Sequence, residues 1–181
     1  MTGLLIRDAL AKDVDACMAL DHQYETEHVW QMAIQQTGGG WQIAFKTQRL
    51  PRKMEVEYPA DARRLHLCLS ETQCFLVAVD RETDEVFGYL TMRMEPVRRT
   101  AWVQDIVVDR AYRHQGIGSR LIKIARQWAL EHDALRLMVE TRTKNYPAIQ
   151  FCTHSGLMFC GYNDHYLEDQ DIAVFFGQTL A

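Results

Sequence analysis

Alternating and periodic apolar positions divide this chain into short strands and helices. Apolar runs rich in β-branched and aromatic residues predict strands at 4–6, 74–79, 86–94, 101–108, 135–140, 158–162 and 172–176. The polar segment 81–85 predicts a hairpin between the second and third of these, which the 101–108 strand extends into an antiparallel meander. Apolar residues three and four apart predict a helix at 117–128, with Ile117, Leu121, Ile124, Ala125 and Trp128 buried. Another helix is predicted from Asn145 to about Ser155, ended by Gly156.

The first sixty residues have a less regular pattern. Asp13 has the character of an N-cap for a helix that uses Val14, Cys17 and Leu20. A second helix is predicted at about 27–36, ended by the glycines at 38–40. Alternation then predicts an extra hairpin or flap at about 41–59, with its turn at 49–53. This segment has three possible roles: a lid, a homodimer contact or a solvated insertion.

Composition limits the class of protein. A chain of 181 residues with 48% hydrophobic and 24% charged residues is expected to form a single domain, 1–181, with one full core. A net charge of −4 without a long basic run argues against binding to nucleic acid. Five cysteines without a Cys-x-x-Cys pair predict reduced thiols. No apolar run has the length of a signal or a membrane span, so we expect a cytoplasmic protein.

The segment between the 101–108 strand and the following helix is suited to binding a phosphate. Its two glycines let backbone N–H groups approach one anion, and the helix dipole adds positive charge. The dinucleotide fingerprint would need a small residue where Leu121 stands, and no Gly-Lys-Ser/Thr run exists. The residues of this loop are Arg113, His114, Gln115, Gly116, Ile117, Gly118 and Ser119.

Two motifs carry a resemblance to a known superfamily. Arg113-x-x-Gly116-x-Gly118 after a strand resembles the acetyl-coenzyme A pyrophosphate loop of the Gcn5-related N-acetyltransferases (GNAT). Residues 145–152, followed by Gly156-Leu157, resemble the second signature, Asn-x-x-Ala-x-x-Phe-Tyr. Segments 104–108, 138–141 and 172–176 are most similar to streptothricin acetyltransferases and related small-molecule members.

The resemblance implies an α/β (α+β) GNAT fold. Its mixed, mostly antiparallel sheet of about seven strands has splayed fourth and fifth strands and helices on both faces. It also implies acetyl-CoA as cofactor, with the pantetheine arm between the splayed strands and the pyrophosphate at residues 113–119. The other implied cofactor-binding residues are Ile106, Val107, Val108, Asn145, Ala148, Phe151 and Cys152.

The implied reaction is direct attack of an amine on the acetyl thioester, which needs a proton acceptor and an oxyanion donor. Glu140 and Asp105, one on each splayed strand, are equally good candidates for the proton-accepting carboxylate. A backbone N–H near Val107 is the candidate donor to the oxyanion. Cys152 stands where the family usually places its tyrosine acid. Either this thiol, Tyr146, Tyr162 or water then supplies the proton.

The sequence says least about the acceptor substrate, the molecule that receives the acetyl group. The turn formed by Asp164, His165 and Tyr166, together with Asp105 and Glu140, is the expected substrate-binding region, although turn chemistry alone explains its polar residues. No His, Cys or carboxylate spacing matches a metal site. We expect transfer to a primary amine of a small cationic molecule. The alternatives are a protein N-acetyltransferase and a catalytically silent acyl-CoA-binding sensor.

Overall fold

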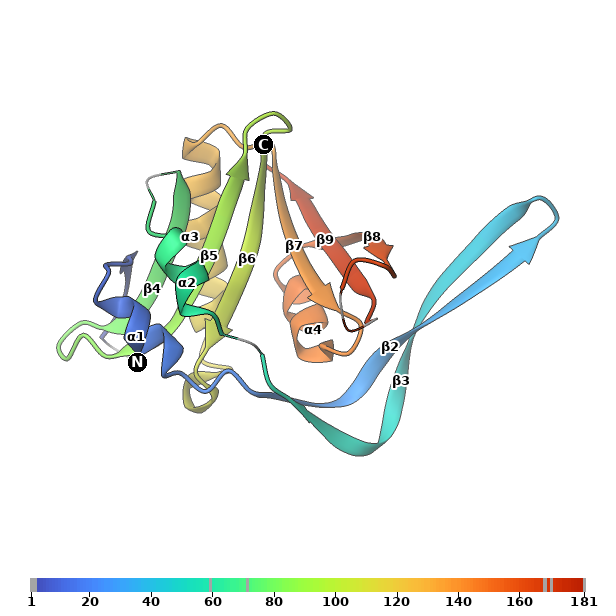
Figure 1. The fold of residues 1–181 in the computed structure, drawn as a ribbon, viewed down its shortest axis with the longest axis horizontal. Coiled ribbons are helices and arrows are strands. Elements are labelled where there is room, and N and C mark those ends of the chain that lie inside the picture. The colour runs from blue at the N-terminus through green and yellow to red at the C-terminus, as the bar shows by residue number, and fades with distance from the viewer. Residues whose placement is uncertain (1–2, 59, 71, 168, 170, 181) are drawn as a thin grey trace.

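The computed structural model describes residues 3–58, 60–70, 72–167, 169 and 171–180, and seven strands of this part form one sheet (Figure 1). Their order is β1-β4-β5-β6-β7-β9-β8, and all neighbours are antiparallel except β6 and β7. The predicted mixed, mostly antiparallel sheet is therefore confirmed. The strands are β1 (Leu4–Asp8), β4 (Gln73–Asp80), β5 (Val86–Glu95), β6 (Thr100–Val108), β7 (Arg136–Arg142), β8 (Met158–Asn163) and β9 (Ala173–Thr179).

Helices cover both faces of the sheet, because side chains alternate between its two sides. α1 (Asp13–Met18) and α2 (Ala62–Leu67) bury Val14, Cys17 and Leu65 in one apolar cluster against β4 and β5. α3 (Ile117–Glu131) and α4 (Tyr146–His154) contribute to a larger cluster on the other face. A short 3-10 helix, η1 (Arg110–Tyr112), joins β6 to α3. In α3 the predicted Ile124 is 39% exposed, and Ile122 and Ala129 are buried instead.

The first sixty residues differ most from the sequence prediction. Residues predicted as a helix at 27–36 belong to the strand β2 (Tyr24–Thr37), which pairs with β3 (Gly40–Val56) in a two-stranded hairpin. The glycines cause the difference: Gly38 and Gly39 have positive φ and form the hairpin turn rather than a helix cap. The predicted turn at 49–53 is also wrong, since those residues lie within β3. Pro59, the last residue of the predicted flap, lies outside the described residues.

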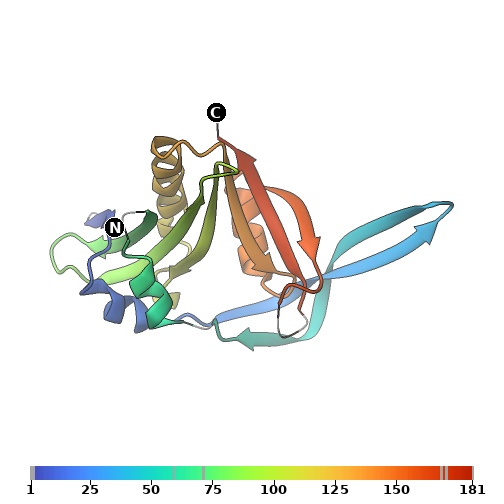
Figure 2. The ribbon, with the colours of Figure 1, turned by 45° about the horizontal axis from the view of Figure 1, so that its top comes forward.

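This hairpin, called the arm below, leaves the body and extends beyond it in both views (Figures 1 and 2). Near the body, Trp30 and Phe45 pack against Phe159, with ring centroids 5.6 and 5.2 Å apart. The Trp30 N–H donates to the Thr143 carbonyl over 2.9 Å, which ties β2 to the loop after β7. The base of the arm is therefore part of the packed molecule.

Asp13 has a different role from the predicted N-cap. It is the first residue of α1, and Lys12 holds the cap position without a side-chain hydrogen bond. The Asp13 carboxylate is 3% exposed and accepts from Arg7 at 2.6 Å and from the Leu10 N–H at 2.7 Å. Burial raises the pKa of Asp13, but these donors outweigh it and hold the pKa below its usual value. Asp13 therefore fixes α1 to β1 through a buried ion pair.

Candidate active site

The fourth and fifth strands of the sheet, β6 and β7, are paired along only part of their length. Their parallel register runs from Thr100 opposite Arg136 to Val103 opposite Val139, and ends there. Both strands continue beyond it, β6 to Val108 and β7 to Arg142. The ribbons diverge over this stretch in Figure 1. We call the space between these unpaired halves the splay gap. Along it, backbone N–H and C=O groups of β6 and β7 face each other without forming hydrogen bonds between the two strands.

A β-bulge in β6 lies at the start of the splay gap. Thr91 is opposite Asp105, whereas Met92 is opposite Val103, so Gln104 is an extra residue in β6. Because of it, Val103 packs in the cluster under α3, while Val107 packs on the α1 and α2 side. The bulge therefore changes which side chains of β6 face each side of the sheet where the strands separate.

The register also indicates which backbone groups face the splay gap. The Asp109 N–H donates to the Phe87 carbonyl over 2.9 Å, and pairs along an antiparallel ladder alternate between bonded and non-bonded. The backbone N–H and C=O of Val107 therefore point toward β5. The position of the Val107 carbonyl oxygen agrees, because it lies only 2.6 Å from where a Cβ on Gly88 would be. Ile106 and Val108 turn their backbone groups toward the gap. We infer that these two, rather than Val107, offer free N–H groups there.

The predicted phosphate loop lies between η1 and α3. Gly116 is the N-cap of α3 with φ 84°, and His114 also has a positive φ of 62°. Among the described residues, the N–H groups of 114–119 have no acceptor in the protein, and the first intrahelical bond is that of Arg120 to the Gly116 carbonyl. The backbone of this loop thus presents donors at the positive end of a fifteen-residue helix, which is the arrangement that binds phosphate.

The Arg113 side chain, a predicted cofactor contact, binds three backbone carbonyls of the protein. Its guanidinium donates to the carbonyls of Val108 at 2.9 Å, Gln23 at 2.6 Å and Asp21 at 2.9 Å. Burial lowers the pKa of Arg113, because loss of solvent disfavours the charged guanidinium, while the nearby Asp21 and Asp109 act against this. Arg113 therefore ties the end of β6 to the segment between α1 and β2.

The second motif forms the opposite wall of the loop. Asn145 caps α4 by accepting the Ala148 N–H over 3.1 Å, so its side chain has a structural role. An ideal Cβ on Gly118 would lie 3.1 Å from the Phe151 ring, which shows how closely α3 and α4 approach. The two motifs, separated in the sequence by most of α3 and by β7, therefore meet at Gly118 and Phe151.

Cys152 does not line an open surface. Its thiol is 0% exposed and packs in the cluster under the sheet with Ile149 and Leu157. Burial raises the pKa of Cys152 to about 12. Such a thiol packs like a small apolar side chain, and this placement does not favour proton transfer to a substrate.

Asp105 is enclosed by hydrogen-bond donors. The carboxylate is 2% exposed and accepts from Tyr58 at 2.6 Å, Arg64 at 2.6 Å and Thr91 at 2.7 Å. Burial and the nearby carboxylate raise the pKa of Tyr58, so the phenol stays a donor. The ion pair with Arg64 joins α2 to β6 beside the bulge. This environment is that of a buried structural ion pair.

Glu140 has a more open environment on the opposite strand. It is half-buried, and burial raises the pKa of its carboxyl, although a hydrogen bond from Tyr166 and the charges of Arg142 and Arg93 act against the rise. The carboxylate in turn raises the pKa of Tyr166, whose ring lies 5.8 Å from that of Phe175. Of the predicted turn, Tyr166 thus reaches Glu140, whereas the His165 side chain is 92% exposed and lies 3.9 Å from Asp164.

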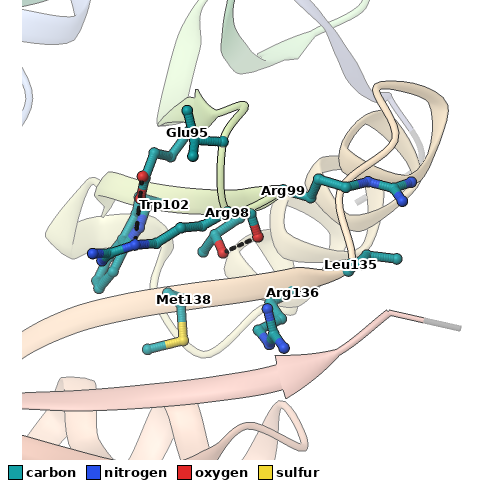
Figure 3. Close-up of a pocket in the computed structure, with 9 residues that line it drawn as sticks. Glu95, Arg98, Arg99, Trp102, Leu135, Arg136 and Met138 are labelled. Carbon is teal, nitrogen blue, oxygen red and sulfur yellow. Dashed lines mark hydrogen bonds and ion pairs between the residues drawn. The ribbon is translucent and has the colours of Figure 1, made fainter.

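Two surface hollows flank these strands. The larger, about 490 Å³, lies at the paired end of β6 and β7, away from the splay gap, and includes Trp102, Met138, Arg98 and Arg136. Figure 3 shows the Arg98 side chain pointing toward Glu95, with which it forms an ion pair at 3.8 Å. The smaller hollow, about 210 Å³, lies beside the splay gap, where Arg113 binds the carbonyls of Asp21 and Gln23. Its lining residues are Leu20, Asp21, His22, Gln23, Glu57 and Tyr58.

Several residues near the gap were not assigned from the sequence. Tyr58 and Arg64 reach Asp105, and Asp21 and Glu57 line the smaller hollow. They come from segments more than forty residues from Asp105 in the chain, without a local motif that could have linked them to it. These residues come close to the splay gap only because the folded chain places α2 and the two ends of the arm beside it.

The arrangement can hold a phosphate-bearing group at the α3 N-terminus and an extended chain in the splay gap, with Glu140 at the gap for proton transfer. Within the described residues, no group of three or more His, Cys, Asp or Glu side chains is arranged to hold a metal. None of the described helices is long and apolar enough to span a membrane.

Several known proteins are similar to this chain in sequence or in structure. A streptothricin acetyltransferase of Escherichia coli is 34% identical over 61 residues, which are 34% of this chain and 35% of that protein. The match thus spans about a third of that relative's length. The structure of a nourseothricin acetyltransferase superposes with a TM-score of 0.83 at 22% identity, covering 99% of both chains. A Bacillus anthracis protein assigned as a streptothricin acetyltransferase, in complex with acetyl coenzyme A, gives 0.80 at 22%, covering 98% and 99%.

These two superpositions establish the shared fold. The sequence also matches the model of the acetyltransferase (GNAT) family over residues 40–157, more than half of the chain. That range contains the bulge in β6, the phosphate loop and α4, which together form the site described above. The chain therefore belongs to the acetyltransferase (GNAT) family.

Proposed function

We propose that this protein transfers the acetyl group of acetyl-CoA to a primary amine of a small cationic molecule. The observation that carries the proposal is the early end of β6–β7 pairing at Val103 and Val139, with free N–H groups of 114–119 beside it. Apolar strands, unpaired backbone and an anion-binding helix terminus form one continuous site. The structure of a similar protein in complex with acetyl coenzyme A supports the choice of donor.

Acetyl-CoA fits the residues present. The backbone of 114–119 would bind its pyrophosphate, and Ile106 and Val108 would pair with the pantetheine arm. Ala148 and Phe151 would form the other wall, with Phe151 against Gly118. The thioester supplies the activated acetyl group. The inferred N–H of Ile106 or Val108 then stabilises the negative charge that develops on the carbonyl oxygen.

Glu140 is the proposed proton acceptor. It lies on the strand across the gap, and burial raises its pKa toward the range in which a carboxylate accepts a proton from an ammonium group. The charge of the carboxylate also attracts a cationic acceptor. Tyr166 lies close enough to this carboxylate to affect its pKa. Asp105, with three donors, is assigned a structural role that supports the bulge.

A cationic acceptor is supported by the smaller hollow. Two carboxylates, Asp21 and Glu57, line it together with His22 and Tyr58. His22 lies 3.3 Å from the Tyr89 hydroxyl, and Tyr89 is opposite Val107 in the sheet. The hollow therefore borders the splay gap on the side opposite α3. Two negative charges at this entrance favour an acceptor with a second positive group.

The proton for the leaving thiol is assigned to Tyr146 or to water. The burial of Cys152 supports a packing role for this residue. Tyr146 is half-buried at the first residue of α4, directly after the loop that follows β7. The leaving thiol of coenzyme A has a low enough pKa to depart with little assistance.

Calorimetry with acetyl-CoA, followed by a thiol-release screen, tests the proposal. We expect saturable binding of acetyl-CoA, and thiol release with small cationic amines but not with peptides. Absence of acetyl-CoA binding would overturn it. Release with peptides alone would identify a protein N-acetyltransferase, and binding without release for any amine would identify an acyl-CoA sensor. Only the first pattern is compatible with the proposed reaction.

A further inference from the structure

The two faces of the arm differ in chemistry. Cross-strand partners share a face, so Ile34 with Ile43 and Gln36 with Trp41 lie on the face that contains Met32 and Phe45. The opposite face presents Gln35 with Gln42 and Ala33 with Ala44. One face of the ribbon is thus apolar and aromatic, and the other is polar.

The apolar face is covered near the body and uncovered beyond it. At the base, Trp30 and Phe45 pack on Phe159, Phe176 and Tyr162 with centroid distances between 5.2 and 5.8 Å. Toward the tip, Ile34 and Ile43 are each 43% exposed and Trp41 is 69% exposed. Phe159 itself remains 42% exposed at the edge strand β8. The covered stripe therefore continues into an uncovered one.

Isolated two-stranded ribbons are marginally stable in water, and an exposed apolar strand face invites association. The arm tip, 32–37 and 40–44, contains no charged residue. A membrane surface is a poor match, since lipid-binding segments combine apolar residues with basic ones. The complement that does fit is present on the same chain, in the exposed aromatic base at Phe159.

We propose that the arm is a dimerisation element whose apolar face is covered by a second copy of this chain. The two arms lie face to face and antiparallel about a two-fold axis, so that the tip of each, with Ile34, Ile43 and Trp41, packs on the aromatic base of the other. Such a contact is isologous, because the same patch serves both copies.

The size of this surface fits a dimer. A tip of six residues in one strand and five in the other is about 20 Å long, and a two-stranded ribbon is roughly 10 Å wide. Two tips and two bases then contribute roughly 800 Å² of projected area, and the accessible surface that they bury is larger. This area approaches the lower limit of specific interfaces, about 1,200 Å² of buried accessible surface. The contact is independent of the acetyl-CoA site, which lies within each copy.

The test compares two matched double variants by light scattering coupled to gel filtration. Ile34→Glu with Ile43→Glu places two charges on the apolar face, and Gln35→Glu with Gln42→Glu places two on the polar face of the same ribbon. Both pairs are direct cross-strand partners, so the cost to the hairpin is similar. We expect a dimer for the wild type and the polar-face variant, and a monomer for the apolar-face variant.

Hydrogen exchange of the arm is the second readout. In the wild type, amides of 32–44 should become more protected as protein concentration rises, and in the apolar-face variant they should not. A monomeric wild type, including one whose arm instead binds vesicles or another protein, overturns the proposal. The proposal is also overturned if the apolar-face and polar-face variants are both monomeric or both dimeric. Acetyl-CoA binding, measured on each variant, reports separately on the proposed function.

Discussion

At the scale of single residues, the two candidate carboxylates are separated by their surroundings. Asp105 and Glu140 occupy equivalent places in the sequence pattern, one on each splayed strand. Asp105 is 2% exposed with three donors, whereas Glu140 is half-buried beside Tyr166. A carboxylate already saturated with hydrogen bonds is poorly placed to take a proton from a substrate.

Glu140→Gln should lower kcat/KM for a cationic amine about 100-fold, which is typical for loss of a general base. Because burial raises the pKa of Glu140, the wild-type enzyme should lose activity as pH falls through that raised value, above the usual carboxyl range. The variant should lack this acid limb. An identical pH profile for both enzymes would assign proton transfer to another group.

Asp105→Asn should act on stability rather than on chemistry. Because the Arg64 side chain is 36% exposed, breaking this pair should cost about 2 kcal/mol of unfolding free energy, less than for a fully buried pair, and Arg64→Leu should cost a similar amount. In a double-mutant cycle by urea denaturation, the two effects should be far from additive because they remove the same pair. Additive effects, or a normal stability with a large fall in kcat, would contradict the structural role.

At the scale of elements, the phosphate loop depends on the junction of β6, α3 and α4. Gly118 is fixed by its contact with Phe151, so a larger side chain there would disturb packing before it tested charge. Ser119, in the same first turn, is exposed and can carry a new charge without a steric clash. It is the better position for an electrostatic test.

Ser119→Glu should weaken acetyl-CoA binding at least 10-fold in calorimetry, since a carboxylate would repel the pyrophosphate at close range. The same charge should leave stability unchanged or raise it slightly, because acidic groups favour helix N-termini. Gln127→Glu, about 12 Å further along the same helix, is the matched control and should bind normally. Equal affinity in all three proteins would show that the pyrophosphate binds elsewhere.

At the scale of the whole molecule, the arm is attached to the body by aromatic packing at its base. Phe45 contacts Trp30, Phe159 and Tyr162, and so joins β3 to the edge of the main sheet. At its other end, β3 leads to Tyr58, which donates to Asp105 over 2.6 Å. The aromatic contacts at the base of the arm thus attach the hairpin to the body.

Phe45→Ala should reduce the free energy of unfolding by about 2 kcal/mol, less than for a fully buried phenylalanine because this ring is only partly covered. Urea denaturation measures this change. Lys46→Ala, next to it on the polar face, should have almost no effect. Equal stability of both variants would mean that the arm base adds nothing to the fold.

The sequence by itself determined the elements whose signals are local. The 101–108 strand, the glycine loop and the helices predicted at 117–128 and at about 145–155 each depend on neighbouring residues, and all of them form close to the predicted positions. Local signals were misleading at 27–36, where an apolar pattern compatible with a helix forms a strand. The pairing of those residues with 41–49 gives them backbone partners that a single-segment pattern does not reveal.

Only the tertiary structure decided the roles of the polar side chains. Arg113 donates to carbonyls 90 and 92 residues away, and Asp105 accepts from Arg64, 41 residues away. Such partners are chosen by where the chain folds back, and the charge of a residue alone does not identify them. The sequence thus determined the glycine loop before α3, whereas tertiary contacts enclose Asp105 with three donors and leave Glu140, the proposed proton acceptor, half-buried.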